Sequence, residues 1–521
     1  MKPLLKFLMK NYSKIIIFVI LVIASFYRLY RIRDYLTFLG DEGRDVLVVY
    51  KILHGSFTLL GPTASVGGFF LGPIYYYFMA PFLWLFNYDP VGPAIMVALF
   101  GIATVWLVYK VGKELFGVSV GLIAAGLYAI SPLVVTYSRS SWNPNLMPFF
   151  SLLTLYFVYK ALIKNNFKLF ALSGFLFGIT MQLHYLATFL GVIIFAYMLL
   201  YQFVYSKINF ISKIIKQYLT FFLGFLIGWF PFLAFEIRHG FRNTISIFNF
   251  IFKGQETNKS LHFFSTVGNV FFRIFGRLVT NFPAAEKISL YAKTNLNYWY
   301  LATLVLGIIS IGFLLYEFLK EYKLRSQDFG KISLVFVWFI FGVGLFGFYK
   351  KSIYDYYFGF MFPLPFLIIG ILLKNLWANR IGKVLSIFAL LTLIWFNNLT
   401  PFYKYPPNKQ LDQMEGISKF VISKTENKPF NFALIAGGNS DHAYRYFFTL
   451  WKKEPITIQN LMVDPERKTV TNQLFVVCED LVCKPLGHSL WEIAGFGRAE
   501  IAGEWNVSVV KLFKLVHYRG K

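Results

Sequence analysis

Residues 15–27 read IIIFVILVIASFY, an apolar run without a charged side chain, and four lysines precede it between residues 2 and 14. This arrangement is typical of a signal sequence, but no pair of small residues marks a cleavage site after the run, which ends in FYR at 26–28. We therefore predict an uncleaved first transmembrane helix at about 14–30, with the N-terminus inside.

The composition of the whole chain requires a lipid environment. Of the 521 residues, 57% are hydrophobic and 15% are charged, whereas soluble chains are about half apolar and about a quarter charged. Apolar runs of about 20 residues recur over the first 400 positions, and such a run spans a hydrocarbon core of about 30 Å. The formal net charge is +26, but the basic residues gather mostly in short clusters between the runs, as in cytoplasmic loops. The charge thus reflects membrane topology, and we exclude nucleic acid as a partner.

The alternation of apolar runs and lysine clusters predicts about eleven transmembrane helices. They lie at about 14–30, 91–109, 117–136, 146–160, 169–186, 187–205, 217–235, 297–318, 332–349, 355–373 and 384–400. Residues 69–86 are rich in tyrosine, which favours the membrane interface. They predict an interfacial or re-entrant helix, with a full span as the alternative. Long outer stretches are expected at 31–90 and 236–295.

From Pro401 the composition changes, and we divide the chain into a transmembrane domain, 1–400, and a soluble domain, 401–521, which lies outside the cytoplasm in this topology. Strand-like and helix-like segments alternate in the second domain, which predicts a small α/β domain. The predicted strands are 430–435, 473–477 and 507–516, and the predicted helices are 442–452 and 490–496. Both cysteines, Cys478 and Cys483, lie in this domain, where they form a small-loop disulfide or remain free thiols.

The most informative polar stretch follows the first predicted helix, where residues 38–45 read FLGDEGRD. Adjacent carboxylates at a membrane surface need a cation, a hydrogen-bonding partner or open water. One interpretation is therefore a solvated loop in which nearby arginines, Arg33 and Arg44, neutralise the acidic pair. Two adjacent carboxylates without further oxygen ligands make a poor metal site, so we predict none.

The order of motifs over residues 36–190 resembles that of the GT-C fold glycosyltransferases of the protein O-mannosyltransferase and aminoarabinose-transferase superfamily. The matching stretches are DEGR at 41–44, GPIYYY at 72–77, KELFG at 113–117 with AA at 124–125, SPL at 131–133 and YSR at 137–139. The resemblance implies an α-helical polytopic membrane protein with the GT-C fold and a dolichyl- or undecaprenyl-phosphate sugar as the donor.

This implied reaction has few chemical requirements. A polyprenyl phosphate leaves as a weak base, so the enzyme needs no general acid; it needs one carboxylate to take the proton of the acceptor hydroxyl and cations to hold the phosphate. We predict that Asp41 is the base and that Glu42 positions the acceptor or Asp41. A single displacement of this kind inverts the anomeric centre.

For the donor phosphate we predict Lys350 and Lys351, because matched family members carry a basic, tyrosine-bearing stretch at a similar place. Arg139 and Arg238 are further candidates. The alternative for the two lysines is that they snorkel to the membrane interface, and for Arg139 that it is a simple loop charge.

For the acceptor or the sugar we predict Arg44, Asn143, Asn145 and His184. The two asparagines stand where the family has a second acidic residue, and because an amide is no base they can only hydrogen-bond a ligand. A second departure from the family is the absence of a lysine before the proline in LGP at 71–73. The alternative for His184 is a hydrogen-bonded histidine at the interface.

These features predict an inverting glycosyltransferase at the outer face of a cytoplasmic membrane, in a bacterial host. It moves a sugar from a polyprenyl phosphate to a hydroxyl of a lipid, glycan or protein, without a cofactor. The competing class is a lipid or polyisoprenoid transporter or flippase, which would show inverted repeats and midplane polar residues. A third class is a surface-polysaccharide polymerase or ligase.

Overall fold

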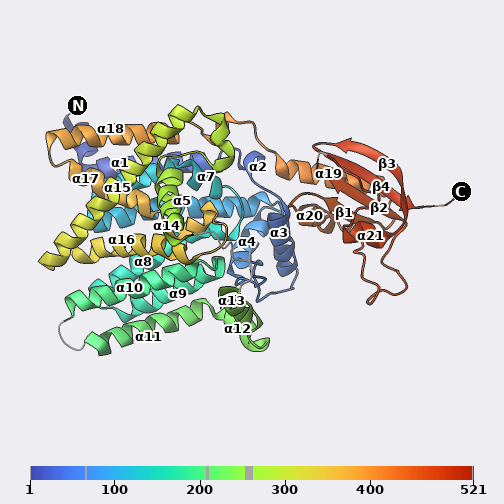
Figure 1. Cartoon of the computed structure of the whole chain (residues 1–521), viewed down its shortest axis with the longest axis horizontal. Helices are drawn as coiled ribbons and strands as arrows, with labels where there is room; N and C mark the ends of the chain where they lie inside the picture. The colour runs from blue at the N-terminus through green and yellow to red at the C-terminus, as the bar shows by residue number, and fades with distance from the viewer. Residues whose placement is uncertain are drawn as a thin grey trace.

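The computed structural model describes residues 2–64, 67–206, 210–252, 262–480, 482–518 and 520, and the side chains of these except 2–10 and 250–252. A bundle of helices and a small sheet domain lie side by side along the long axis of the molecule, and helices α3 and α20 meet at their junction (Figure 1).

The bundle consists of helices of very different lengths. In chain order they are α1 Lys2–Leu29, α2 Ile32–Tyr35, α3 Gly40–Leu53, α4 Ile74–Leu85, α5 Val91–Phe116, α6 Val118–Ile130, α7 Pro132–Tyr137, η1 Asn143–Leu146, α8 Met147–Lys164, α9 Phe167–Leu183, α10 Ala187–Tyr205, α11 Phe210–Gly228, α12 Phe230–Arg238, α13 Arg242–Phe252, α14 Phe263–Arg273, η2 Ile274–Val279, η3 Ala285–Leu290, α15 Lys293–Leu324, α16 Phe329–Gly344, η4 Leu345–Phe348, η5 Asp355–Met361, α17 Leu364–Leu376 and α18 Arg380–Asn397.

Within the described residues, 8 helices are long and apolar enough to cross a membrane, or up to 9 if the bent pair η5 and α17 is one span. Each predicted span falls on one helix, on two consecutive helices or on this pair; the span predicted at 217–235 covers the end of α11 and most of α12. The spans predicted at 117–136 and 169–186 fall on the shorter apolar helices α6 and α9. The expected α-helical polytopic fold is therefore confirmed.

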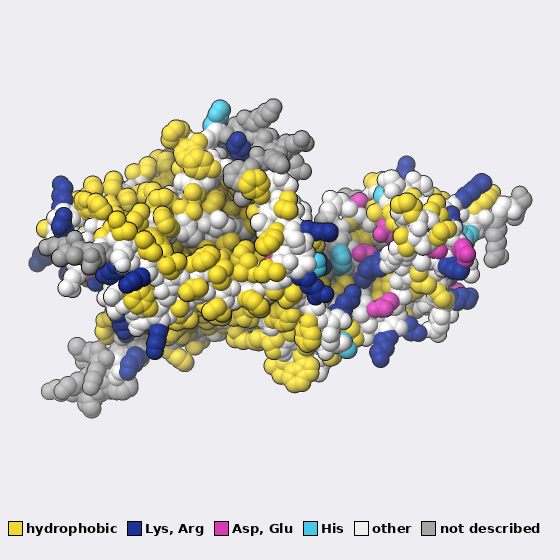
Figure 2. Space-filling model, turned by 90° about the horizontal axis from the view of Figure 1, so that it is seen from below, with side chains coloured by type: hydrophobic (Ala, Val, Ile, Leu, Met, Phe, Trp, Pro, Cys, Tyr) yellow, Lys and Arg dark blue, Asp and Glu magenta, His cyan; other side chains and the backbone are white. Residues whose placement is uncertain are grey.

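The surface of the bundle is suited to lipid. Phe203, Ile227 and Phe388 are 66%, 67% and 69% exposed, and contiguous apolar surface of this kind is not stable in water. Figure 2 shows hydrophobic side chains over the bundle and basic side chains at its end farthest from the sheet domain. The bundle thus has the apolar flank and charged end that a membrane imposes.

The sheet domain contains α19 Gln410–Lys424, β1 Asn431–Ile435, α20 His442–Leu450, β2 Gln473–Cys478, α21 Trp491–Phe496, β3 Ala499–Val507 and β4 Val510–His517. The strand order is β1-β2-β4-β3; β1 and β2 run parallel, and β4 is antiparallel to both of its neighbours. The small C-terminal α/β domain is confirmed. The sequence did not reveal β3, because this edge strand is largely exposed, carries charges and is interrupted by a bulge between Ile501 and Gly503.

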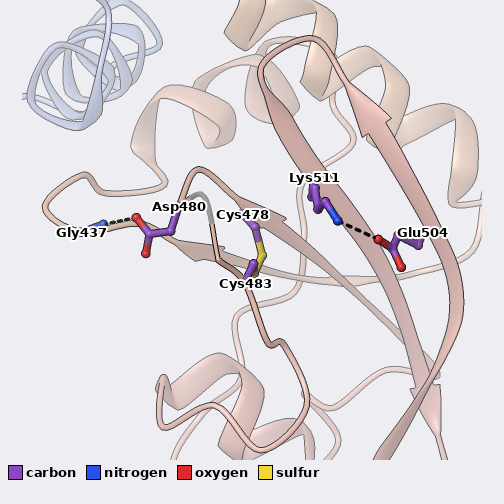
Figure 3. The surroundings of a disulfide bond; sticks show 6 residues. All are labelled: Gly437, Cys478, Asp480, Cys483, Glu504 and Lys511. Atoms are coloured by element: carbon purple, nitrogen blue, oxygen red, sulfur yellow. Dashed lines mark hydrogen bonds and ion pairs between the residues drawn. A yellow bond between two sulfur atoms is a disulfide. The ribbon is translucent and has the colours of Figure 1, made fainter.

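Cys478 and Cys483 are joined by a disulfide, with their Cα atoms 6.1 Å apart (Figure 3). The sequence left open a small-loop disulfide or two free thiols, and the structure has the disulfide. The loop begins at the last residue of β2, on the side of the sheet where the parallel strands β1 and β2 end.

The bundle and the sheet domain are held together by polar contacts as well as by packing. Arg33 pairs with Asp89 of the bundle and, at 2.9 and 3.1 Å, with Asp412 and Glu415 of α19. The hydroxyl of Tyr446 on α20 donates to the backbone oxygen of Tyr88. Arg33 thus serves this junction and does not pair with the acidic residues at 41 and 42.

Two expected outer stretches contain helices that the sequence did not predict. In 31–90, α3 begins within the acidic motif itself, and in 236–295 the structure has the end of α12 and all of α13, α14, η2 and η3. Part of the second stretch, 253–261, lies outside the described residues. The motif GDEGRD reads as a loop because it holds two glycines and three acids, but acidic residues in a first turn stabilise a helix through its dipole.

Candidate active site

The acidic motif forms the first turns of α3. The carboxylate of Glu42 accepts a hydrogen bond of 3.1 Å from the amide of Leu39, which precedes the helix. The glycines of the motif permit close packing against α20, because a Cβ on Gly43 would lie 2.3 Å from the amide nitrogen of Ala443. The sequence therefore places Asp41 at a helix start that is wedged between the bundle and the sheet domain.

An arginine holds the side chain of Asp41. Arg44 Nη1 donates to Asp41 Oδ1 at 3.0 Å, and Arg44 Nη2 lies 2.8 Å from Oδ1 of Asp45. Asp45 is fully buried and also accepts from the hydroxyl of Tyr76 at 3.2 Å. Asp41 itself is 58% exposed, so the half-buried Arg44 and the buried Asp45 fix a carboxylate that still faces open space. The local ion pair with Arg44 that the sequence suggested is present.

Burial alters the acidity of the other two carboxyl groups. It raises the pKa of Glu42 to about 7 and the pKa of Asp45 to about 6, because desolvation disfavours the charged form. One oxygen of Asp45, Oδ2, is buried and has no hydrogen-bond partner in the structure. Among the three acids of the motif, Asp41 is thus the exposed one.

Asp41 lies on the wall of a cavity of about 240 Å³, which we call the Arg44 cavity, with Arg44, Asn143, His184, Trp142 and Tyr356 among its lining residues. The rings of Trp142 and Tyr356 lie 4.4 Å apart. The structure therefore brings four predicted site residues to one cavity: Asp41, Arg44, Asn143 and His184. The aromatic pair was not predicted.

Within this cavity the backbone orients the two remaining predicted side chains. Asn143 Nδ2 donates to the oxygen of Leu183 at 2.6 Å, and His184 Nδ1 accepts from the amide of Leu186 at 3.2 Å. Because Nδ1 accepts, a neutral His184 carries its proton on Nε2, where it can donate to a ligand.

Asp41 and Trp142 also line a second cavity of about 610 Å³, which we call the Ser440 cavity. Glu42 and Asn145 belong to its wall on the bundle side, and the turn Gly438–Ser440 of the sheet domain forms another part of it. Asn145 Nδ2 donates to the oxygen of Ser140 at 2.9 Å. The predicted base thus stands where two cavities meet.

The turn before α20 forms hydrogen bonds both to the start of α3 and to the residues that follow β2. Asn439 Oδ1 accepts from the amide of Gly40 at 2.8 Å, and its Nδ2 donates to the two carboxylate oxygens of Glu479 at 3.1 and 3.0 Å. Asp480 Oδ1 accepts from the amide of Gly437 at 3.0 Å (Figure 3). Glu479 and Asp480 directly follow β2, inside the loop that the disulfide closes.

Other predicted candidates lie elsewhere. Arg139 is buried, donates to the backbone oxygens of Tyr27 and Tyr30 at 2.7 Å each, and stacks on Phe402. These hydrogen bonds provide donors for backbone oxygens at the C-terminal end of α1. Lys350, Lys351 and Arg238 line neither the Arg44 cavity nor the Ser440 cavity. The structure therefore does not bring these four cations to Asp41.

A basic cluster that the sequence did not reveal lies close by. Arg273 Nη2 and Arg277 Nε lie 2.5 and 2.9 Å from the carboxylate of Asp355. Arg273 also donates to the oxygen of Ile353 at 2.7 Å. The cluster fixes the start of η5 and hence the neighbouring ring of Tyr356. Among the described residues no group of three or more His, Cys, Asp or Glu side chains could hold a metal ion.

Comparison with known proteins agrees with this architecture. Residues 71–235 match the model of the family described as dolichyl-phosphate-mannose-protein mannosyltransferase. The structure is similar to ArnT from Cupriavidus metallidurans bound to undecaprenyl phosphate, with a TM-score of 0.59 and 11% identity over 97% of this chain and 98% of that one. It is also similar to the archaeal oligosaccharyltransferase AglB from Archaeoglobus fulgidus, in complex with an inhibitory peptide and a dolichol-phosphate. The TM-score is 0.52, and the sequences are 14% identical over 90% of this chain and 70% of that one.

No curated protein matches the sequence. At the identities of the two structural matches, the likeness establishes the architecture. The chain has the GT-C fold, as its motifs predicted.

Proposed function

We propose that this GT-C fold chain is an inverting glycosyltransferase that moves a sugar from a polyprenyl phosphate to an acceptor hydroxyl. The observation that carries the proposal is the position of Asp41. Its carboxylate is exposed, is held by Arg44 and lines both cavities. A base between two cavities can meet a donor from one side and an acceptor from the other.

The similar proteins support the class of donor. ArnT is bound to undecaprenyl phosphate and AglB to a dolichol-phosphate, and both ligands are polyprenyl phosphates. In this chain the donor phosphate fits the Arg44 cavity, since Arg44 supplies a cation there and His184 a hydrogen-bond donor. Lys350, Lys351, Arg139 and Arg238 need not contact the phosphate in this arrangement.

The proposed step is one displacement. Asp41 takes the proton of the acceptor hydroxyl as its oxygen attacks the anomeric carbon, and the bond from that carbon to the phosphate oxygen breaks. The electron pair of the broken bond leaves with the polyprenyl phosphate, which needs no proton because it is a weak base. The attack comes from the face opposite to the phosphate and therefore inverts the anomeric centre. Protonated Asp41 then returns its proton to water.

The reaction is proposed to take place at the outer face of a cytoplasmic membrane, on the side of the domain that we place at 401–521. Disulfides persist in oxidising compartments, so the Cys478–Cys483 bond supports an extracytoplasmic position for this domain. The lysine-rich end of the bundle would then face the cytoplasm. A bacterial host is part of the same proposal.

The test is transfer by the purified protein in nanodiscs, with a panel of radiolabelled polyprenyl-phosphate sugars and lipid and glycan extracts as acceptors. Asp41→Asn should lower transfer by about 10²- to 10⁴-fold, the usual contribution of a general base, and leave binding of undecaprenyl phosphate within about twofold.

Asp34→Asn is the matched control, because Asp34 forms the same kind of ion pair with an arginine three residues away and lines neither cavity. Undiminished transfer by Asp41→Asn would refute the proposal. Movement of the lipid between leaflets without sugar transfer would instead favour a flippase.

A further inference from the structure

The two cavities that meet at Asp41 differ in charge. Asp41 lines both cavities, and the Arg44 cavity also has the cation of Arg44 and the neutral ring of His184 on its wall. Among the described residues that line the Ser440 cavity, none is a lysine, arginine or histidine, whereas Asp41 and Glu42 are both present. An anionic ligand in the Ser440 cavity would therefore find no cationic side chain on the described wall to pair with, and the exposed Asp41 carboxylate would repel it.

The remaining lining of the Ser440 cavity has the chemistry of a carbohydrate site. Trp142 and Tyr137 offer aromatic surface, and Ser140, Asn145 and Ser440 offer hydroxyl and amide groups. Aromatic rings pack against the apolar faces of sugars, and hydroxyl and amide groups can both donate and accept hydrogen bonds. This combination suits an uncharged ligand with many hydroxyl groups.

The sheet domain supplies part of this wall through a turn with a defined position. Asn439 is bound on one side to the amide of Gly40 and on the other to Glu479, and the hydroxyl of Ser440 lies 2.7 Å from Nδ1 of His442. The wall is therefore built into the domain junction, next to the exposed carboxylate of Asp41.

We propose that the Ser440 cavity is the acceptor site and that it takes an uncharged carbohydrate, with the turn Gly438–Ser440 as its outer wall. This assignment rests on the proposed function, because it leaves the Arg44 cavity to the donor phosphate. An acceptor hydroxyl in the Ser440 cavity reaches Asp41 from the side opposite to the donor.

Gly438 allows a direct test, since a Cβ at this position would meet no atom within 4 Å. Gly438→Trp therefore adds a large ring to a residue of the cavity wall without a clash at the Cβ. Gly416→Trp is the matched control: Gly416 is an exposed glycine of α19 whose added Cβ also meets nothing within 4 Å, and it does not line the cavity.

The experiment measures binding to the full chain in nanodiscs by native mass spectrometry. The probes are a panel of neutral oligosaccharides, the same oligosaccharides carrying a phosphate, and undecaprenyl phosphate. A neutral glycan should bind at least tenfold more tightly than its phosphorylated counterpart. Gly438→Trp should weaken the neutral glycan at least tenfold and leave undecaprenyl phosphate within twofold, and Gly416→Trp should change neither.

Three results would overturn the assignment: equal or tighter binding of the phosphorylated glycans, no binding of any glycan, or unchanged binding of the neutral glycan by Gly438→Trp. If the wild-type chain bound neutral glycans as expected but no undecaprenyl phosphate, the proposed function would fail while the carbohydrate site would stand.

Discussion

The side-chain oxygen of Asn439 accepts a hydrogen bond of 2.8 Å from the amide of Gly40, across 399 positions of sequence. Gly40 is the first residue of α3, so its amide is one of the four at a helix start that have no partner within the helix. An asparagine of the sheet domain thus completes the helix that carries Asp41. The junction of the two units is part of the proposed catalytic apparatus.

Asn439→Ala should therefore lower both stability and transfer. Loss of a capping acceptor costs about 1 kcal/mol, and a less well fixed α3 should reduce kcat more than it raises KM for the donor. Thermal unfolding and transfer kinetics would check this. Asn506→Ala, at an exposed position of β3, is the control and should change neither. An increase in KM with an unchanged kcat would contradict a positioning role.

The disulfide leads to a second prediction, because Glu479 and Asp480 lie inside the loop that it closes and hold the turn of Asn439. Closing a loop with a sequence separation of 5 stabilises the fold by about 2 kcal/mol in the chain-entropy account. Reduction should lower the unfolding temperature and the rate of transfer together.

Measurements with and without dithiothreitol would test this effect. The double variant Cys478→Ser with Cys483→Ser should resemble the reduced protein and lose its response to the reagent. If the double variant kept wild-type kcat, the disulfide would have no part in holding the turn.

Local patterns explain why much of the fold was predictable. An apolar run of about 20 residues can be recognised without knowing its neighbours, and so α1, α5 and α15 were evident from the sequence. The pairing of Asp41 with Arg44 was also expected, because the two residues are close in sequence, but the helix that sets their i,i+3 spacing was not predicted. Asn143 was a candidate because of its position in the family resemblance, and His184 because it lies at the outer end of a predicted helix.

The rest of the site depends on contacts that no local pattern contains. Asn439 and Glu479 follow the parallel strands β1 and β2, and the crevice outside the carboxyl ends of parallel strands is where functional residues of α/β sheets gather. The turn GGNSD at 437–441 was therefore a usable signal. The pairing of Asp355 with Arg273 and Arg277 left no such signal, because the two segments are about 80 residues apart.

The buried carboxyl of Glu42 should make the stability depend on pH. Burial raises its pKa from 4.5 to about 7, so the folded protein favours the neutral form. Stability should fall as the pH rises from 4.5 to 7, by about 3 kcal/mol at 1.36 kcal/mol per unit. Asp45 acts in the same direction, since burial raises its pKa to about 6.

Glu42→Gln should remove its share of this pH dependence, because an amide cannot ionise. Unfolding in denaturant at pH 5 and pH 8 would measure the difference, which should be smaller in the variant by up to about 3 kcal/mol. Glu466→Gln, at a position 71% exposed, should follow the wild type. If the free energy of unfolding changed equally between pH 5 and pH 8 in Glu42→Gln and in the wild type, Glu42 would be ionised throughout this range.

Gly43 provides the most direct test of the junction, since α3 and α20 touch at this point. A Cβ there would lie 2.3 Å from the amide nitrogen of Ala443, and backbone atoms cannot yield as a flexible side chain can. Gly43→Ala should therefore push α20 away, expose the linker near α19 to protease and abolish most of the transfer. Gly268→Ala in α14 is the control, because its Cβ would meet no atom within 4 Å and alanine favours a helix over glycine by about 1 kcal/mol. Wild-type protease resistance and transfer in Gly43→Ala would mean that the close contact of α3 with α20 is not needed to hold Asp41 in place.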